Sequence, residues 1–297
     1  MASISQKQIQ RLLHDNAKAG DFIYHRRWGE AGKDFQCPRC AHCALPGAAE
    51  LPFARCRSCR TVSGPLSGTI LGKTKVPADN LLWMTWAIST RPGGLSAVEA
   101  SRETGLSRVT SQRVIRLIRH ALAQDERGRQ LTGEVEADET FLGGKGRDTN
   151  RRGRSEPKKC VLVLAERHQG GRCVLTYTKD AKATTLIPII KRSVEKGSHI
   201  YTDGHRAYGS LGKIGYTHTE HVIQGSGVRA HVLLPAVHQV AKTLKEQLQG
   251  THKRTPKDEL LQDYLGSFQW RYNHRDLKPV DAFLEALDVI LGVSGGE

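Results

Sequence analysis

The sequence predicts a multidomain α+β protein built from three successive parts. Two CxxC motifs lie in polar sequence near the N-terminal end, at Cys37–Cys40 and Cys56–Cys59. Apolar residues then recur at helical spacing between residues 77 and 121. From Leu131 the pattern changes to short β-prone runs, one intervening helix and further helices, which is typical of an α/β domain with a mixed sheet. The expected domains are 1–72, 73–128 and 129–297.

The chain carries a strong positive charge. Its 297 residues include 45 Lys and Arg against 30 Asp and Glu, a formal net charge of +15. Because self-repulsion of this size opposes compaction, the excess favours binding to a polyanion, and nucleic acid fits best. The apolar stretch Leu81–Ile88 is too short to span a bilayer, and the N-terminus lacks a signal-peptide core. We therefore expect a cytoplasmic protein with no membrane partner.

The first part is expected to be a zinc ribbon. The two CxxC motifs are separated by 15 residues, and each can present two thiolates from a tight turn. Four thiolates satisfy a closed tetrahedral Zn²⁺ site, and a reducing compartment favours metal binding over disulfides. His42 and Cys43 lie close enough to substitute as ligands. The predicted structural zinc ligands are Cys37, Cys40, Cys56 and Cys59.

The second part is expected to be a helix-turn-helix. After a helix over Pro77–Ser89, Ser96 should cap a second helix, with Glu99 completing a capping box. Thr104–Leu106 supplies the turn, and a third helix should run from Ser107 to Ala121. Its outward residues would enter a major groove of DNA, although trihelical units also occur as plain packing modules. The predicted DNA-binding residues of this helix are Arg108, Ser111, Arg113 and Arg116.

The third part begins with a predicted hairpin of strands. Strands are expected at 134–142, 160–167 and 172–178, followed by a helix from Thr184 to Gly197 and a strand over 198–202. Residues 143–159 are rich in glycine and arginine and should form a basic insertion loop, either solvated or in contact with DNA. Cys160 and Cys173 lie in apolar runs and are expected to be buried small hydrophobes.

Two aspartates occupy matching positions in this order of elements. Asp138 lies in the first strand and Asp203 follows the fourth. Three antiparallel strands, a helix and a further strand can place the two side by side, as in RNase H-like folds. Paired carboxylates are the hard oxygen ligands that Mg²⁺ requires, and two such ions can stabilise both oxygens of a phosphodiester displacement. The alternative is that both are ordinary surface aspartates.

Four segments together resemble a known family. VEADETFLGGK, YTDGHRAY, LPAVHQVAKTLKEQLQGTH and FQWRYNHR are similar, in order, to motifs of bacterial insertion-sequence transposases with an N-terminal zinc ribbon and an ISXO-like DDE domain. The resemblance runs from about Trp28 to Arg275. It implies an RNase H-like core, Mg²⁺- or Mn²⁺-dependent DNA cleavage and strand transfer, and binding of terminal inverted repeats and target DNA. It also implies a homodimer or higher oligomer on DNA and a nucleoid-associated protein. By this likeness, Asp138 and Asp203 are the metal carboxylates.

The third acidic position of the family pattern is not acidic here. His238 stands where these enzymes place a Glu on a following helix, and Lys245 lies seven residues further along the same helix face. An imidazole suits Mn²⁺ better than Mg²⁺, or could position or protonate the 3′-oxygen leaving group. His238 could otherwise be an ordinary helix-face histidine. Lys245 would contact DNA phosphate or be a solvated lysine. If the third ligand lies elsewhere, the substitutes are Glu139, Glu220 and Glu246.

Two further interpretations concern the end of the chain and the overall activity. Arg271 and Arg275 alternate with Trp270 and Tyr272, which could form a DNA-binding face or simply pack the helix. The missing third acid also allows a DNA-binding regulator derived from a transposase with an inactive catalytic domain. A nuclease or resolvase that cuts without joining is a further alternative.

Overall fold

The computed structural model describes residues 4–42, 51–143, 158–221, 230–253 and 255–292. The chain divides into two compact units. One comprises Met1–Asp125 together with Leu277–Glu297, and the other comprises Glu126–Asp276. Within the described residues, no helix combines the length and the apolar character that crossing a bilayer would require.

The N-terminal unit begins with helices that support a small ribbon. Its first elements are α1 (Gln6–Leu12), α2 (Asn16–Trp28), the 3-10 turn η1 (Glu30–Gly32), β1 (Ala54–Arg55) and β2 (Val62–Ser63). Ser5 and Asp15 cap the first two helices through their side-chain oxygens. The two short strands pair antiparallel, with Ala54 opposite Ser63. Beneath the ribbon, Trp28 packs edge-on against Phe35, with ring centroids 4.9 Å apart.

Three further helices follow, close to their predicted bounds. They are α3 (Ala78–Thr90), α4 (Ala97–Thr104) and α5 (Arg108–Asp125). Ser96 Oγ accepts the amide of Glu99 at 3.2 Å, but the Glu99 carboxylate pairs with Arg91. The predicted capping box is therefore only half formed. Gly105 takes the left-handed conformation, with φ at 70°, in the turn that joins α4 to α5.

One predicted position on α5 is wrong. Ser111 was expected on the outer face, but it is fully buried, on the stripe that also carries Val114, Ile115 and Ile118. Positions three, four and seven residues apart lie on one side of a helix, so Ser111 continues the core stripe. The other three predicted residues are exposed: Arg108, Arg113 and Arg116.

The last helix belongs to this unit and not to the region that precedes it in sequence. Helix α10 (Pro279–Gly292) contributes Phe283, Leu287 and Leu291 to a cluster with residues of α1, α2 and α3. These three positions recur every fourth residue and so form one apolar face. Arg26 of α2 donates to Asp288 of α10 at 2.6 Å. This packing differs from the expected domain 129–297, which included α10.

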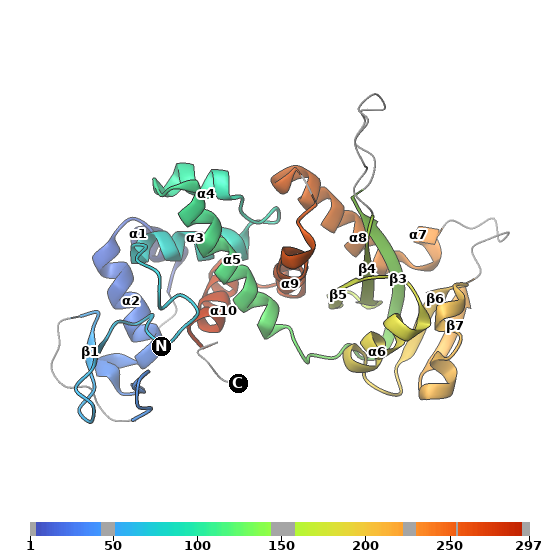
Figure 1. Ribbon diagram of the computed structural model, residues 1–297, viewed down its shortest axis with the longest axis horizontal. Helices are drawn as coiled ribbons and strands as arrows, with labels where there is room; N and C mark the ends of the chain where they lie inside the picture. Colours follow the sequence, from blue (N-terminus) through green and yellow to red (C-terminus); the bar gives the residue numbers. More distant parts are fainter. Residues whose placement is uncertain (1–3, 43–50, 144–157, 222–229, 254, 293–297) are drawn as a thin grey trace. The chain divides into compact units, whose positions relative to one another are not determined.

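The second unit is built on a five-stranded mixed sheet in the order β5-β4-β3-β6-β7 (Figure 1). The strands are β3 (Glu134–Leu142), β4 (Lys159–Glu166), β5 (Cys173–Thr178), β6 (His199–Asp203) and β7 (Thr217–His221). β3, β4 and β5 are antiparallel neighbours, whereas β6 runs parallel to both β3 and β7. The mixed sheet confirms the predicted strands, and β7 is an additional one.

Helices cover both faces of this sheet. On one face lie α6 (Ala183–Ser193) and the 3-10 turns η2 (Arg206–Tyr208) and η3 (Leu211–Ile214). On the other lie α8 (Pro235–Gln247), the π-helical turn η4 (Leu248–His252) and α9 (Asp258–Asn273), and the short α7 (Ala230–Leu233) precedes α8. Cys160 and Cys173 are buried, as predicted, with exposed fractions of 5% and 0%.

Candidate active site and metal centre

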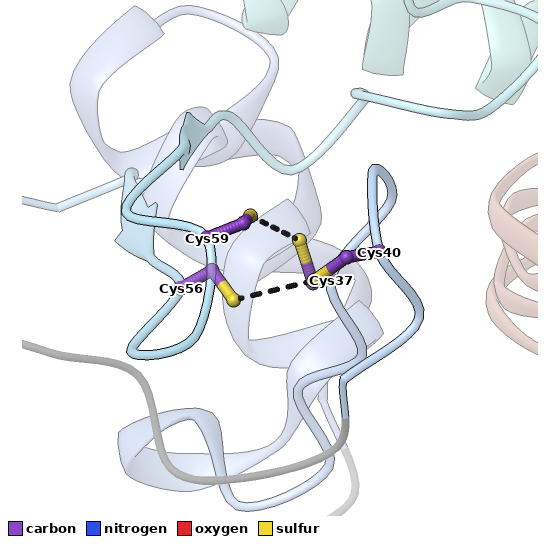
Figure 2. Close-up of side chains that lie close together, drawn as sticks. All are labelled: Cys37, Cys40, Cys56 and Cys59. Carbon is purple, nitrogen blue, oxygen red and sulfur yellow. Dashed lines mark hydrogen bonds between the residues drawn. The ribbon is translucent and has the colours of Figure 1, made fainter.

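The four predicted cysteines converge between the two ribbon loops. Figure 2 shows the four side chains pointing toward one another. Their Sγ atoms all lie within 4.8 Å of one another. Cys37 and Cys59 are 3.7 Å apart, and so are Cys40 and Cys56. A tetrahedron with Zn–S bonds of about 2.3 Å has edges of about 3.8 Å, so these separations fit one Zn²⁺ ion.

The backbone of each loop explains this convergence. In each knuckle the amide after the second cysteine bonds to the carbonyl of the first, at 2.9 Å for Ala41 and 3.0 Å for Arg60. Ala41 and Arg60 have positive φ values of 56° and 62°, which close the turns tightly. The Thr61 hydroxyl and amide lower the pKa of Cys59 to about 6, which favours a thiolate. His42 contributes through its backbone, because its carbonyl accepts the Cys37 amide and its amide hydrogen-bonds to Cys40, and Cys43 lies outside the described residues.

The two aspartates also converge, through the register of two parallel strands. Ala137 of β3 pairs with Thr202 of β6, so the next residues, Asp138 and Asp203, are neighbours on the same face. Asp138 accepts the Glu139 amide at 2.8 Å, and Asp203 accepts the His205 amide at 3.0 Å. Burial raises the pKa of Asp138, and the negative charge of Asp203 raises it further.

Helix α8 brings two more predicted residues to this pair. His238 Nε2 lies 3.9 Å from the second oxygen of Asp138. His238 and Lys245 each lower the pKa of Asp138, which partly offsets the increase that burial causes. A cleft of about 580 Å³ is lined by Asp138, His238, Lys242 and Lys245. The structure therefore places carboxylates, an imidazole and lysines around one opening.

The sequence prediction missed Glu136, the residue that holds α8 in this position. Glu136 is fully buried, two residues before Asp138 on the same face of β3. One of its oxygens accepts the Val237 amide in the first turn of α8 at 3.0 Å, and the other lies 3.2 Å from Nε of Arg167. The Leu234 N-cap offers no side-chain acceptor, so Glu136 takes that role. Burial raises the pKa of Glu136, which the Val237 amide and Arg167 oppose.

The three substitute acids differ in their surroundings. Glu139 accepts a hydrogen bond from the hydroxyl of buried Tyr208 at 2.5 Å, and burial raises the pKa of Glu139. By strand alternation Glu139 lies on the face opposite Asp138, although it also reaches the cleft. Glu246 lines the cleft from α8, whereas Glu220 is exposed on β7.

The late arginines are engaged within the unit. Arg271 donates to Gln247 at 2.7 Å and to Ser267 at 3.0 Å. Arg275 donates to the Gly171 carbonyl at 2.9 Å, and its guanidinium lies 4.2 Å from the centre of the Tyr272 ring. Trp270 is fully buried. These contacts fit the packing interpretation of α9, and the DNA contact stays a prediction. Most of the basic loop 143–159 lies outside the described residues.

Together these features define a helical unit with a four-cysteine cluster and a mixed α/β unit with a carboxylate–histidine cleft. Residues 130–273 match the family model of the ISXO2-like transposase domain. The chain is also 26% identical over 273 residues to an uncharacterized protein in transposable element ISH50 of Halobacterium salinarum, covering 86% of this chain and 90% of that protein. Residues 130–273 are thus similar to the ISXO2-like transposase domain, and the predicted resemblance to insertion-sequence transposases is confirmed.

Proposed function

We propose that the chain is a DNA transposase that binds the inverted repeats at the ends of an insertion sequence, cleaves a strand there and joins it to target DNA. Asp138 and Asp203 are its metal carboxylates. The observation that carries this proposal is the parallel register of β3 and β6, which makes the two acids neighbours on one face of the sheet, with Asp138 lining the cleft. The transposase-domain match spans both residues.

The donors around the cleft suit a divalent cation. Two neighbouring carboxylates supply hard oxygen ligands, and His238 Nε2 is buried without a hydrogen-bond partner among the described residues. Bound Mg²⁺ or Mn²⁺ would stabilise the attacking and leaving oxygens of an in-line displacement. Lys242 and Lys245 lie on the same wall of the cleft, where they would hold phosphate oxygens of the DNA strand. Catalysis would come mainly from positioning and charge neutralisation.

We assign end recognition to α5 and its neighbours. Arg108, Arg113 and Arg116 are exposed on one helix that follows the Gly105 turn, which suits insertion into a major groove. The cysteine cluster would hold structural Zn²⁺ and stabilise the ribbon. Because two ends must be joined, the active complex would be at least a homodimer on DNA.

The test uses end-labelled inverted-repeat DNA incubated with the full chain and Mg²⁺ or Mn²⁺. The wild type should nick at the ends and join the product to target DNA. Asp138→Asn and Asp203→Asn should bind the repeats with unchanged affinity and fail to cut. Asp276→Asn, an exposed aspartate in the turn after α9, serves as the matched control and should retain cutting. Cutting by Asp138→Asn would refute the assignment.

A second candidate function is supported by the histidine at the third position. Without a third acid the catalytic domain could be inactive. The chain would then act as a DNA-binding regulator, because the helical unit would still bind DNA. The same assay separates the two: the regulator binds inverted repeats and leaves them intact with either ion. His238→Ala is a further discriminator, because in a transposase it should abolish strand transfer while end binding persists.

A further inference from the structure

A row of three side chains crosses the sheet at the level of the aspartates. Asp203 of β6 pairs with His221 of β7, in the same parallel manner as β3 pairs with β6. Paired residues on parallel strands point to the same face and lie about 4.8 Å apart. Asp138, Asp203 and His221 therefore form a continuous row on the face that α8 covers.

Two histidines with buried ring nitrogens adjoin this pair of acids, His238 through its contact with Asp138 and His221 through its strand pairing with Asp203. Nε2 of His221 and Nε2 of His238 are both inaccessible to solvent and have no hydrogen-bond partner among the residues that the structure describes. Buried polar groups are rarely left unpaired, so each such nitrogen calls for an explanation. Nε2 of His238 lies 3.9 Å from a carboxylate oxygen of Asp138, and His221 is opposite Asp203 in the register of β6 and β7.

A third histidine on the same face shows the contrast. His199 precedes Asp203 on β6, and both of its ring nitrogens are paired: Nε2 with the Thr219 hydroxyl at 2.8 Å and Nδ1 with the Tyr201 hydroxyl at 3.3 Å. The ring of His221 stacks against the ring of Tyr201 on the same face of the sheet, with ring planes 9° apart. The ring of His221 is thus held in place while its Nε2 stays unpaired.

We propose that His221 and His238 are nitrogen donors to the divalent-metal site, one beside each aspartate, so that the site prefers Mn²⁺ or a similar transition ion to Mg²⁺. This inference rests on the proposed function and refines its metal requirement. Imidazole is a ligand of transition ions, whereas Mg²⁺ selects oxygen donors in octahedral geometry. Glu220, the acid next to His221, lies on the opposite face by strand alternation and does not supply the missing carboxylate.

The experiment measures Mn²⁺ and Mg²⁺ binding to the zinc-loaded full chain, without DNA or activity. Pulsed electron paramagnetic resonance of bound Mn²⁺ should show nitrogen coupling that changes when the protein is labelled with ¹⁵N-histidine. His221→Ala should weaken Mn²⁺ binding by about tenfold or more and reduce this coupling. The double variant with His238→Ala should lose the coupling altogether. His199→Gln is the matched control and should bind Mn²⁺ as the wild type does.

His221→Asp provides a second variant in which a donor is retained. It replaces nitrogen by oxygen, so it should shift the affinity ratio toward Mg²⁺ while the fold, checked by thermal unfolding, is preserved. Absence of nitrogen coupling in the wild type, or its persistence in the double histidine variant, would overturn the inference. If Asp138→Asn and Asp203→Asn abolish Mn²⁺ binding and the histidine variants do not, the inference alone fails. If the aspartate variants bind Mn²⁺ normally, the proposed active site itself fails.

Discussion

Replacing Glu136 by alanine should release the first turn of α8 from strand β3. The substitution removes the acceptor of the Val237 amide and leaves Arg167, whose side chain is 28% exposed, without its buried partner. A hydrogen bond to a charged group contributes about 1.5–3 kcal/mol, and breaking a buried pair costs about 3–5 kcal/mol. Because Arg167 retains partial access to water, we expect a loss of about 2–4 kcal/mol in the stability of this unit.

Glu136→Gln is the matched control for this prediction. Its amide oxygen can still accept the Val237 amide, and a neutral group avoids the cost of burying a charge. We expect the free energy of unfolding at neutral pH to stay within about 1 kcal/mol of the wild type. The difference between the two variants therefore isolates the capping of α8 from the negative charge.

The pH dependence of Glu136→Gln has a defined sign. Burial raises the pKa of Glu136 in the folded state above its unfolded value of about 4.3. Its contribution to stability is therefore fully present below the unfolded pKa and is lost as pH rises through the folded pKa. Since glutamine does not titrate, the variant should gain stability relative to the wild type across this window and show a constant difference above it.

Hydrogen exchange of the α8 amides and urea unfolding monitor these effects. In Glu136→Ala, amides near Val237 should exchange about 30-fold faster or more, the factor that corresponds to about 2 kcal/mol. Mn²⁺ binding should weaken in Glu136→Ala and recover in Glu136→Gln, because His238 depends on the position of α8. An alanine variant with wild-type protection of α8 and unchanged stability would refute the reasoning.

Four other substitutions are informative: three test the N-terminal unit, and Cys160→Ser, at a buried thiol of the second unit, is the control for one of them. Cys56→Ser should lose bound zinc and make the ribbon sensitive to protease. Cys160→Ser, the control, should retain zinc. Metal analysis that finds zinc in both variants would contradict the assignment of the four-cysteine cluster. Arg113→Glu should weaken inverted-repeat binding about tenfold or more and reduce its salt dependence, as measured by fluorescence anisotropy across a salt series. Ser111→Ala should leave DNA affinity unchanged and alter stability by no more than about 1 kcal/mol, because its buried hydroxyl has no partner among the described residues. A large loss of DNA affinity in Ser111→Ala would return that residue to the interface.

The sequence predicted correctly those elements that are determined by residues close together in the chain. The bounds of β3 were predicted without error, because its apolar alternation ends at a glycine. The cysteine cluster was predictable because each knuckle is a single tight turn. By contrast, β7 has the polar sequence THTEH, and it forms a strand through its pairing with β6. The place of α10 likewise depends on tertiary packing that no local pattern encodes, whereas the helical spacing from Ser111 to Val114, Ile115 and Ile118 could have indicated that Ser111 faces inward.

Within VEADE, chemistry alone could not separate a capping acid from a metal ligand. Glu134, Glu136 and Asp138 share one face of β3, and each meets a different partner: the Tyr201 hydroxyl, the Val237 amide and His238. The start of α8 lies at the level of Glu136, so the Glu136 carboxylate accepts a backbone amide of the first helical turn. Asp138 lies one pleat further along β3, beside His238 of α8, and lines the cleft. The assignment of roles is therefore set by a segment about 100 residues away, and a shift of α8 by one turn would exchange the surroundings of the two acids.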